Sequence, residues 1–211
     1  IGAGAIALNP AWIAWGRTGV SDMLLASNIA MAMLSFFIGY ARRGAGEKLN
    51  TWASDKWYLA FYVFIAFAIL AKGPVGLVLP VLGISAFLFY LGNFKQVLSE
   101  MRPVRGCLII GAIAIPWFIL VTLANGQAYI DTFFGYHNIQ RFTSVVSSHR
   151  GSWYFYLPVV LIGLLPWSIY LPIAIARLRF WQRDKWKQSS RYSQLGLFAL
   201  FWFISVFLFF S

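Results

Sequence analysis

Acidic residues are scarce in this sequence, and histidine and cysteine are scarcer still. Its 211 residues include 6 Asp and Glu, 2 His and 1 Cys. A single cysteine excludes a disulfide framework and a thiolate metal site, so Cys107 is expected to be a small buried apolar residue. Walker A, GxSxG and HExxH patterns are also missing, so the sequence gives no support for a nucleotide-binding protein, a serine hydrolase or a zincin.

Charge of either sign is limited, and long apolar runs take its place. Charged residues make up 11% of the chain, against about a quarter in soluble domains. Hydrophobic residues make up 60%, with a mean hydropathy of +0.71. Apolar runs near twenty residues recur, which is the length that crosses a hydrocarbon core. The sequence therefore predicts an all-α, polytopic transmembrane helical bundle.

About six membrane spans are expected, all within one transmembrane domain that includes residues 1–211. A short apolar run, 1–15, comes first, and the later spans are expected at 23–41, 57–71, 76–91, 107–124, 153–176 and 195–210. Because the first and last residues both lie in apolar sequence, we expect an internal piece of a longer protein.

The basic residues predict how the spans are oriented. Thirteen of the 17 Lys and Arg lie in segments 42–56, 92–106 and 177–194, which alternate with the other connections. By the positive-inside rule these segments face the cytoplasm across a plasma (inner) membrane. The net charge of +11 then reflects membrane topology and anionic headgroups, so nucleic acid is not an expected partner.

Segment 125–152 is the longest polar interruption of the apolar sequence, and alternation places it on the outer face. It holds both histidines, His137 and His149, together with Asn138 and Arg141. The histidines are twelve residues apart and lack an obvious third ligand, so neither a metal site nor a cofactor is expected. A divalent metal is conceivable but unsupported.

Three further ionisable residues, Arg17, Asp22 and Lys72, fall on the same predicted face. Fixed cations near a membrane surface suit a phosphate, since guanidinium and ammonium groups match its oxygens. Lys72 is either such a contact or a lysine snorkelling beside the Gly73–Pro74 turn. Asp22 is either a catalytic carboxylate or a structural group that caps a helix or pairs with Arg17.

Several motifs resemble one family of membrane enzymes. They are NPAWIAWGRTGVSDMLL at 9–25, AKGPVGLVLP at 71–80, FFGYHNIQRF at 133–142, RGSWYFYLP at 150–158 and LLPWSIYLP at 164–172. Together they look like glycosyltransferase family 39 and the lipid A aminoarabinose transferases of the GT-C superfamily. The combination of HNxxRF with a later histidine and WYxYLP is the most specific part.

The resemblance implies a function and a set of site residues. Such enzymes transfer a sugar from a polyprenyl-phosphate carrier to a lipid, glycan or protein acceptor at the outer face. It implies that Arg17, Lys72, His137, Asn138, Arg141 and His149 bind substrate, and that Asp22 is the catalytic candidate within the chain. The family's main aspartate lies upstream of the matched region. The alternative is a transporter or flippase of a lipid-linked anion, which would place charges within spans.

Overall fold

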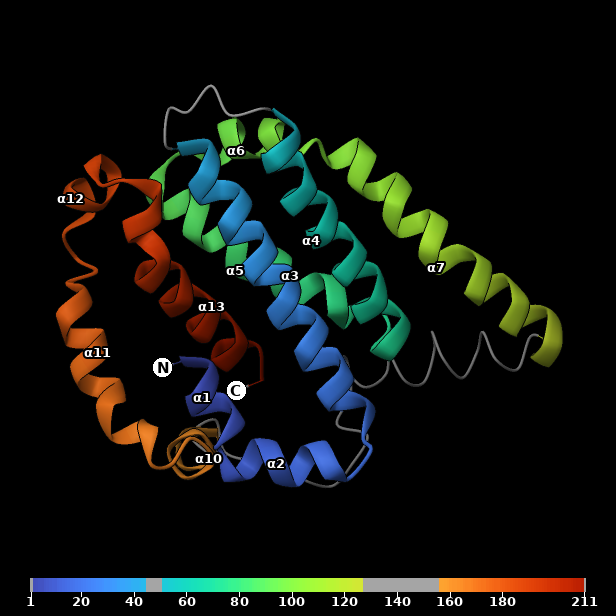
Figure 1. The fold of residues 1–211 in the computed structure, drawn as a ribbon, viewed down its shortest axis with the longest axis horizontal. Helices are drawn as coiled ribbons and strands as arrows, with labels where there is room; N and C mark the ends of the chain where they lie inside the picture. Colours follow the sequence, from blue (N-terminus) through green and yellow to red (C-terminus); the bar gives the residue numbers. More distant parts are fainter. Residues whose placement is uncertain (1, 45–50, 127–155, 211) are drawn as a thin grey trace.

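The computed structural model describes residues 2–44, 51–126 and 156–210, and within these ranges the chain forms helices and no strands. Figure 1 shows the helices, which are α1 (Gly2–Ala7), α2 (Pro10–Arg17), α3 (Ser21–Gly44), α4 (Thr51–Lys72), α5 (Val75–Leu91), α6 (Phe94–Met101), α7 (Pro103–Asn125), α10 (Tyr156–Gly163), η3 (Trp167–Tyr170), α11 (Leu171–Leu178), α12 (Arg183–Gln188), η4 (Arg191–Gln194) and α13 (Leu195–Phe210). The expected all-α architecture is confirmed.

Fewer helices meet the length and hydropathy needed to span a membrane than the sequence predicted. In the described part of the chain these are Ser21–Gly44, Pro103–Asn125 and Arg191–Phe210, with a fourth if one bent pair counts as a single span. α5 is apolar but has only 17 residues. The expectation of about six spans is therefore not confirmed.

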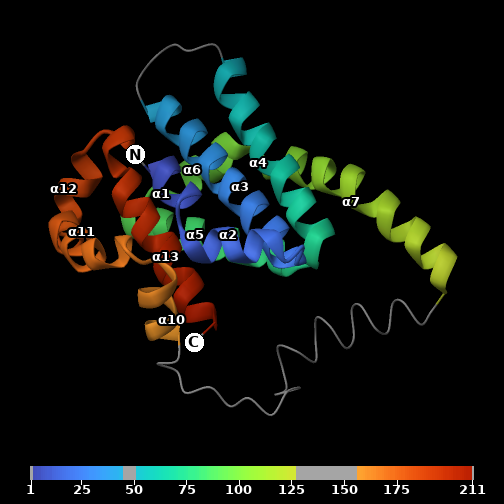
Figure 2. The same ribbon diagram turned by 60° about the horizontal axis from the view of Figure 1, so that its bottom comes forward.

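The core lies around α3, which packs between α4, α5 and α13 (Figures 1 and 2). Phe36 and Tyr40 lie on the same face of α3 one turn apart, and both are fully buried. Phe198 of α13 contacts Phe36 at 5.6 Å and Phe87 of α5 at 5.2 Å between ring centroids. These aromatic contacts join three helices that are far apart in sequence.

The α4–α5 turn is a tight hairpin that depends on glycine. α4 ends at Lys72, and Gly73 takes a φ of 80° that residues with a side chain rarely adopt. Gly76 then lies against α4 so closely that an added Cβ would be 2.6 Å from the carbonyl carbon of Ala68. Small residues at such points allow the backbones of two membrane helices to approach.

The segment predicted as one span, 153–176, is strongly bent in its described part. α10 and the η3–α11 segment meet at an angle of 111° (Figure 2). Pro166 stands in the break, and proline disfavours the helical conformation of the residue before it. The prediction missed this because hydropathy continues unbroken through Leu164 and Leu165 on the N-terminal side of Pro166.

Two segments expected as basic loops contain helices of their own. Segment 92–106 includes α6, which buries Val97 and Met101 on one face. Segment 177–194 includes α12 and η4. Their high charge suggested loops, but apolar residues spaced three or four apart are sufficient for a short amphipathic helix at the membrane surface.

Candidate functional site

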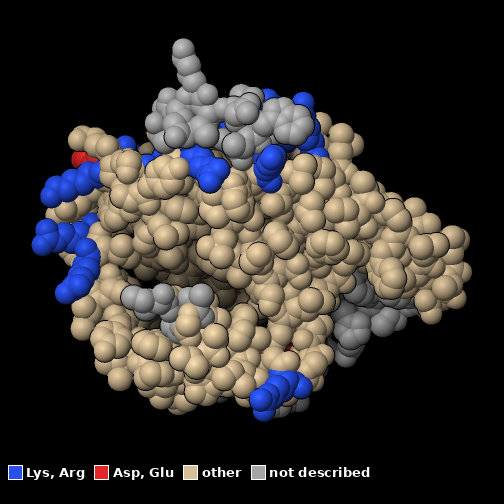
Figure 3. Space-filling model, in the orientation of Figure 1, with Lys and Arg blue, Asp and Glu red and all other residues tan. Residues whose placement is uncertain are grey.

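The described parts of the three basic segments meet at one end of the bundle. Figure 3 shows Lys and Arg gathered along that end, with few on the rest of the visible face. Arg191 of segment 177–194 donates hydrogen bonds to Glu100 of segment 92–106 at 2.9 and 3.2 Å, and to the backbone oxygen of Tyr40, two residues before segment 42–56, at 3.2 Å. Arg183 donates to the backbone oxygen of Tyr90 at 2.6 Å.

A buried polar network lies beneath this basic end. Tyr40 donates its hydroxyl hydrogen to Oε1 of Gln194 at 2.6 Å and accepts a hydrogen bond from Asn93 at 3.0 Å. The guanidinium group of Arg191 lies 4.6 Å from the centroid of the Tyr40 ring. Buried polar groups are stable when they are paired in this way. The network fixes the basic end as one structural unit.

The opposite end of the bundle holds the candidate site residues that the structure describes. α2 ends there, α3 begins there, and α4 ends there (Figure 1). Arg17, Asp22 and Lys72 lie at these three helix ends. The C-terminal end of α7, which leads into segment 125–152, points the same way. These three described residues therefore lie at the end of the bundle opposite the basic segments.

Lys72 and Asp22 form an ion pair and hydrogen bond, with Lys72 Nζ as the donor and Asp22 Oδ1 as the acceptor. The side chains are 38% and 54% exposed, so water and a ligand can reach both groups. Their separation in sequence is 50 residues, which no local pattern predicts. The pair joins a candidate phosphate-binding cation directly to the candidate carboxylate.

Two structural alternatives for Asp22 need correction. The expected local pair with Arg17 is replaced by the pair with Lys72 among the described residues. α3 begins at Ser21, so Asp22 lies in the first turn rather than before it as a cap. A carboxylate in the first turn still favours the helix, because it faces the positive end of the helix dipole.

Four other predicted site residues belong to segment 125–152. His137, Asn138, Arg141 and His149 lie outside the described residues, as does most of segment 125–152. Their assignment to the site stays a prediction. Asn125 ends α7 and Tyr156 begins α10, so these two helices bound the segment.

Metal chemistry gains no support within the described residues, which contain no group of three His, Cys, Asp or Glu that could hold an ion. Cys107 is exposed rather than buried, which corrects the sequence-based expectation. α7 leaves the bundle near its start, so an apolar face there does not become a buried one.

Sequence reasoning also missed the contacts among charged residues at the basic end. It counted Arg102, Arg105 and Arg191 only as contributors to loop charge, and it did not consider Glu100. The Arg191–Glu100 pair spans 91 residues, and no short-range signal in the sequence reveals such a pairing.

Comparison with known proteins gives a consistent result, although no family model matches the sequence. An arabinosyl transferase from Aeromonas hydrophila that acts on undecaprenyl phosphate-α-4-amino-4-deoxy-L-arabinose is 31% identical over 198 residues, which are 93% of this chain and 33% of that protein. Arabinosyl transferase 2 from Proteus mirabilis, named for the same donor, is 28% identical over 196 residues, which are 93% of this chain and 32% of that protein. The chain thus spans about a third of the length of its curated relatives.

Solved structures agree with the sequence matches. The crystal structure of ArnT from Cupriavidus metallidurans bound to undecaprenyl phosphate matches with a TM-score of 0.78 and 27% identity, over 98% of this chain and 34% of that one. The apo structure of the same protein matches with a TM-score of 0.73. In sequence and in fold, the chain therefore resembles the GT-C membrane glycosyltransferases of the aminoarabinose transferase type.

Proposed function

We propose that the full-length protein is an integral membrane glycosyltransferase that takes a sugar from a polyprenyl-phosphate donor. The observation that carries this proposal is the fold match to ArnT bound to undecaprenyl phosphate, which extends over 98% of the chain. The acceptor would be a lipid, glycan or protein at the outer face. The names of the relatives support a pentose as the sugar.

The proposed location is the plasma (inner) membrane, with segments 42–56, 92–106 and 177–194 in the cytoplasm. The gathering of these segments at one end supports a common side. Anionic lipids and the positive-inside rule favour the cytoplasmic side for that end. The Lys72–Asp22 pair and segment 125–152 would then face outward.

Lys72 is the described residue best placed to bind the donor phosphate. Its ammonium group is at a helix end, exposed to water, and adjacent to a turn in which Gly73 and Pro74 keep side-chain bulk away. A cation there stabilises the negative charge that develops on the departing lipid phosphate. Arg17, Arg141, His137, Asn138 and His149 are proposed to complete the substrate-binding surface.

Asp22 is proposed to support the site by holding Lys72. A carboxylate that orients an acceptor hydroxyl must reach it at hydrogen-bond distance. Asp22 is instead bonded to Lys72, which suits a residue that positions the cation before phosphate arrives. The resemblance still implies a main carboxylate upstream of the matched region. No cofactor is proposed, because a sugar attached to a lipid phosphate already carries its leaving group.

The transporter alternative has less support. A carrier for a lipid-linked anion would place ionisable residues within its spans. The charged residues of α3, α4 and α7 lie instead near the helix ends. The names of the relatives also describe transfer of a sugar rather than movement of a lipid.

The decisive experiment uses the full-length protein in proteoliposomes with a panel of radiolabelled polyprenyl-phosphate sugars and a membrane extract as the source of acceptors. Transfer of label from the carrier to another molecule is the expected result. Lys72→Ala should reduce it, whereas the matched change Lys187→Ala at the opposite end should not. Movement of intact labelled carrier across the bilayer without transfer would overturn the proposal in favour of the flippase.

A further inference from the structure

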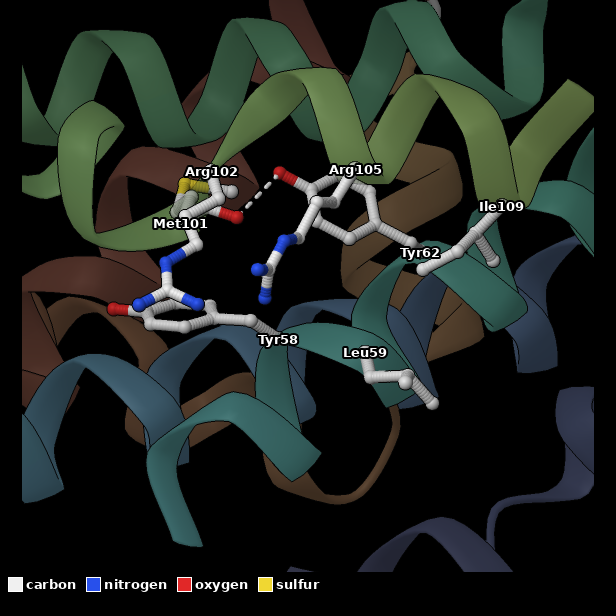
Figure 4. A pocket seen from close by; sticks show the side chains of 7 residues that line it. All are labelled: Tyr58, Leu59, Tyr62, Met101, Arg102, Arg105 and Ile109. Carbon is white, nitrogen blue, oxygen red and sulfur yellow. Dashed lines mark hydrogen bonds between the residues drawn. The ribbon is translucent and has the colours of Figure 1, made fainter. Parts of the chain in front are cut away.

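A pocket with basic residues lies at the opposite end of the bundle from the Lys72–Asp22 pair. It has a volume of about 90 Å³ and opens to the surface between α4, α6 and α7. Its lining consists of Tyr58, Leu59, Tyr62, Met101, Arg102, Arg105 and Ile109. Figure 4 shows the guanidinium groups of Arg102 and Arg105 extending from the α6–α7 turn toward Tyr58.

The walls of this pocket are firmly built. Tyr62 donates its hydroxyl hydrogen to the backbone oxygen of Met101 at 3.2 Å, which ties α4 to the end of α6. Gly106 of α7 lies against the Tyr62 ring, since an added Cβ would come within 2.1 Å of it. Tyr58 is 2% exposed. The two arginines therefore stand over a fixed aromatic floor.

Two of the residues that line the pocket are arginines, and none of them is acidic. Glu100 is the nearest acid in sequence to Arg102 and Arg105, and it is already paired with Arg191. Within the described residues, no hydrogen bond or ion pair engages the side chain of Arg105. Two guanidinium groups at one opening match the oxygens of a single phosphate.

The surroundings of the pocket are apolar. Leu59 on α4 and Leu108 on α7 are exposed, and Ile109 lines the pocket itself. α7 then diverges from α4, and little of its apolar stretch is buried (Figures 1 and 2). An anion bound here would have cations above it and hydrocarbon-compatible surface beside it, which suits a lipid headgroup better than a soluble anion.

We propose that this pocket binds the headgroup of an anionic phospholipid, with Arg102 and Arg105 holding its phosphate. An acyl chain of the lipid would lie along the exposed apolar sides of α4 and α7. The site is separate from the proposed donor site and depends only on the protein lying in a membrane. Failure of the proposed transferase function would not contradict lipid binding at this pocket, and failure of lipid binding would not contradict the transferase function.

The test compares two double variants of the full-length protein that remove the same charge. Arg102 has a φ of 53° and Arg179 a φ of 44°, so glycine suits the backbone at both positions. Arg102→Gly with Arg105→Gln removes both pocket cations. Arg179→Gly with Lys185→Gln removes two cations of segment 177–194 that do not line the pocket.

Native mass spectrometry of detergent-purified protein would measure binding of phosphatidylglycerol and of undecaprenyl phosphate, with phosphatidylcholine as the zwitterionic reference. Wild type and the segment 177–194 variant should bind phosphatidylglycerol preferentially. The pocket variant should bind it roughly tenfold or more weakly, because a charge-assisted contact is lost. Melting temperatures would confirm that both double variants fold. If the pocket double variant does not fold, the single variants Arg105→Gln and Lys185→Gln give the same comparison.

Three results would overturn the proposal. Equal loss in the two double variants would mean that overall surface charge attracts the lipid. Unchanged binding in the pocket variant would mean that another part of the full-length chain covers the pocket. Selective loss of undecaprenyl phosphate, with phosphatidylglycerol unaffected, would assign the pocket to the carrier instead.

Discussion

Arg191 of η4 closes on Glu100 of α6 through two hydrogen bonds, and the two side chains are only 13% and 14% exposed. Both partners sit at the junction of the three basic segments. The pair is therefore a strong candidate for the contact that holds the basic end together.

Removing one partner of this pair should destabilise the protein. Arg191→Gln leaves Glu100 without its cation in a mostly buried position, at a cost on the order of 1.5–3 kcal/mol. Thermal unfolding in detergent, followed by circular dichroism, measures the change. The exposed Lys187→Gln serves as the control and should remain near wild type. An Arg191→Gln protein as stable as that control would mean that the pair contributes nothing.

Gly76→Ala should disrupt the α4–α5 hairpin. The new methyl group would lie 2.6 Å from the backbone of Ala68, which is too close for a real contact, so the two helices must separate. We expect a loss of about 1–3 kcal/mol, as for other overpacked sites. Gly16→Ala is the matched control, because nothing lies within 4 Å of its added methyl. Equal melting temperatures for the two variants would contradict the close approach.

Topology can be read by cysteine labelling after the exposed Cys107 is replaced by serine. Cysteines introduced at Asn50, Gln96 and Gln188 should react only from the cytoplasmic side. A cysteine at Ser147 should react only from the outer side, because segment 125–152 alternates with the basic segments. A reagent that cannot cross the membrane, applied to intact cells, separates the two cases. Labelling of position 188 from outside would invert the proposed orientation.

Lys72→Ala and Arg141→Ala should each weaken use of the lipid-phosphate donor. Each change removes a proposed charged contact worth on the order of 1.5–3 kcal/mol, or roughly ten- to a hundredfold in donor affinity. Donor titrations with full-length enzyme in nanodiscs provide the measurement. If donor kinetics in both variants match wild type, these two residues are surface anchors and not phosphate ligands.

Asp22→Asn separates a supporting role from a catalytic one. The exposed ion pair with Lys72 contributes no more than about 1 kcal/mol to stability, so the variant should fold. If Asp22 only positions Lys72, most activity should remain. A loss of roughly a hundredfold or more, in a folded enzyme that still binds donor, would place the carboxylate in the chemistry and refute the supporting role.

Composition and hydropathy were enough to predict an all-helical membrane protein, because burial in lipid imposes length and apolarity on each span. The alternation of basic segments predicts which helix ends share a membrane face, and that orientation stays a prediction. The 111° bend between α10 and η3 was not predictable from hydropathy, which averages over the proline that causes it.

Contacts between residues far apart in sequence were also not predictable. Asp22 and Lys72 were both selected from their positions beside helix ends, yet their contact depends on how α3 packs on α4. The pocket at Arg102 and Arg105 likewise arises from the angle at which α7 leaves α6. Packing geometry of this kind is set by many side chains at once, and no single motif encodes it.

The buried network at the basic end also bears on how the protein is made. Tyr40 meets Gln194 across 154 residues, and Glu100 meets Arg191 across 91. While the ribosome is still adding α7, Arg191 and Gln194 have not yet been synthesised. Tyr40 and Glu100 therefore lack these hydrogen-bond partners at that stage. Only the arrival of residues 191–194 supplies these partners, so the basic end cannot form all its bonds before η4 has been made.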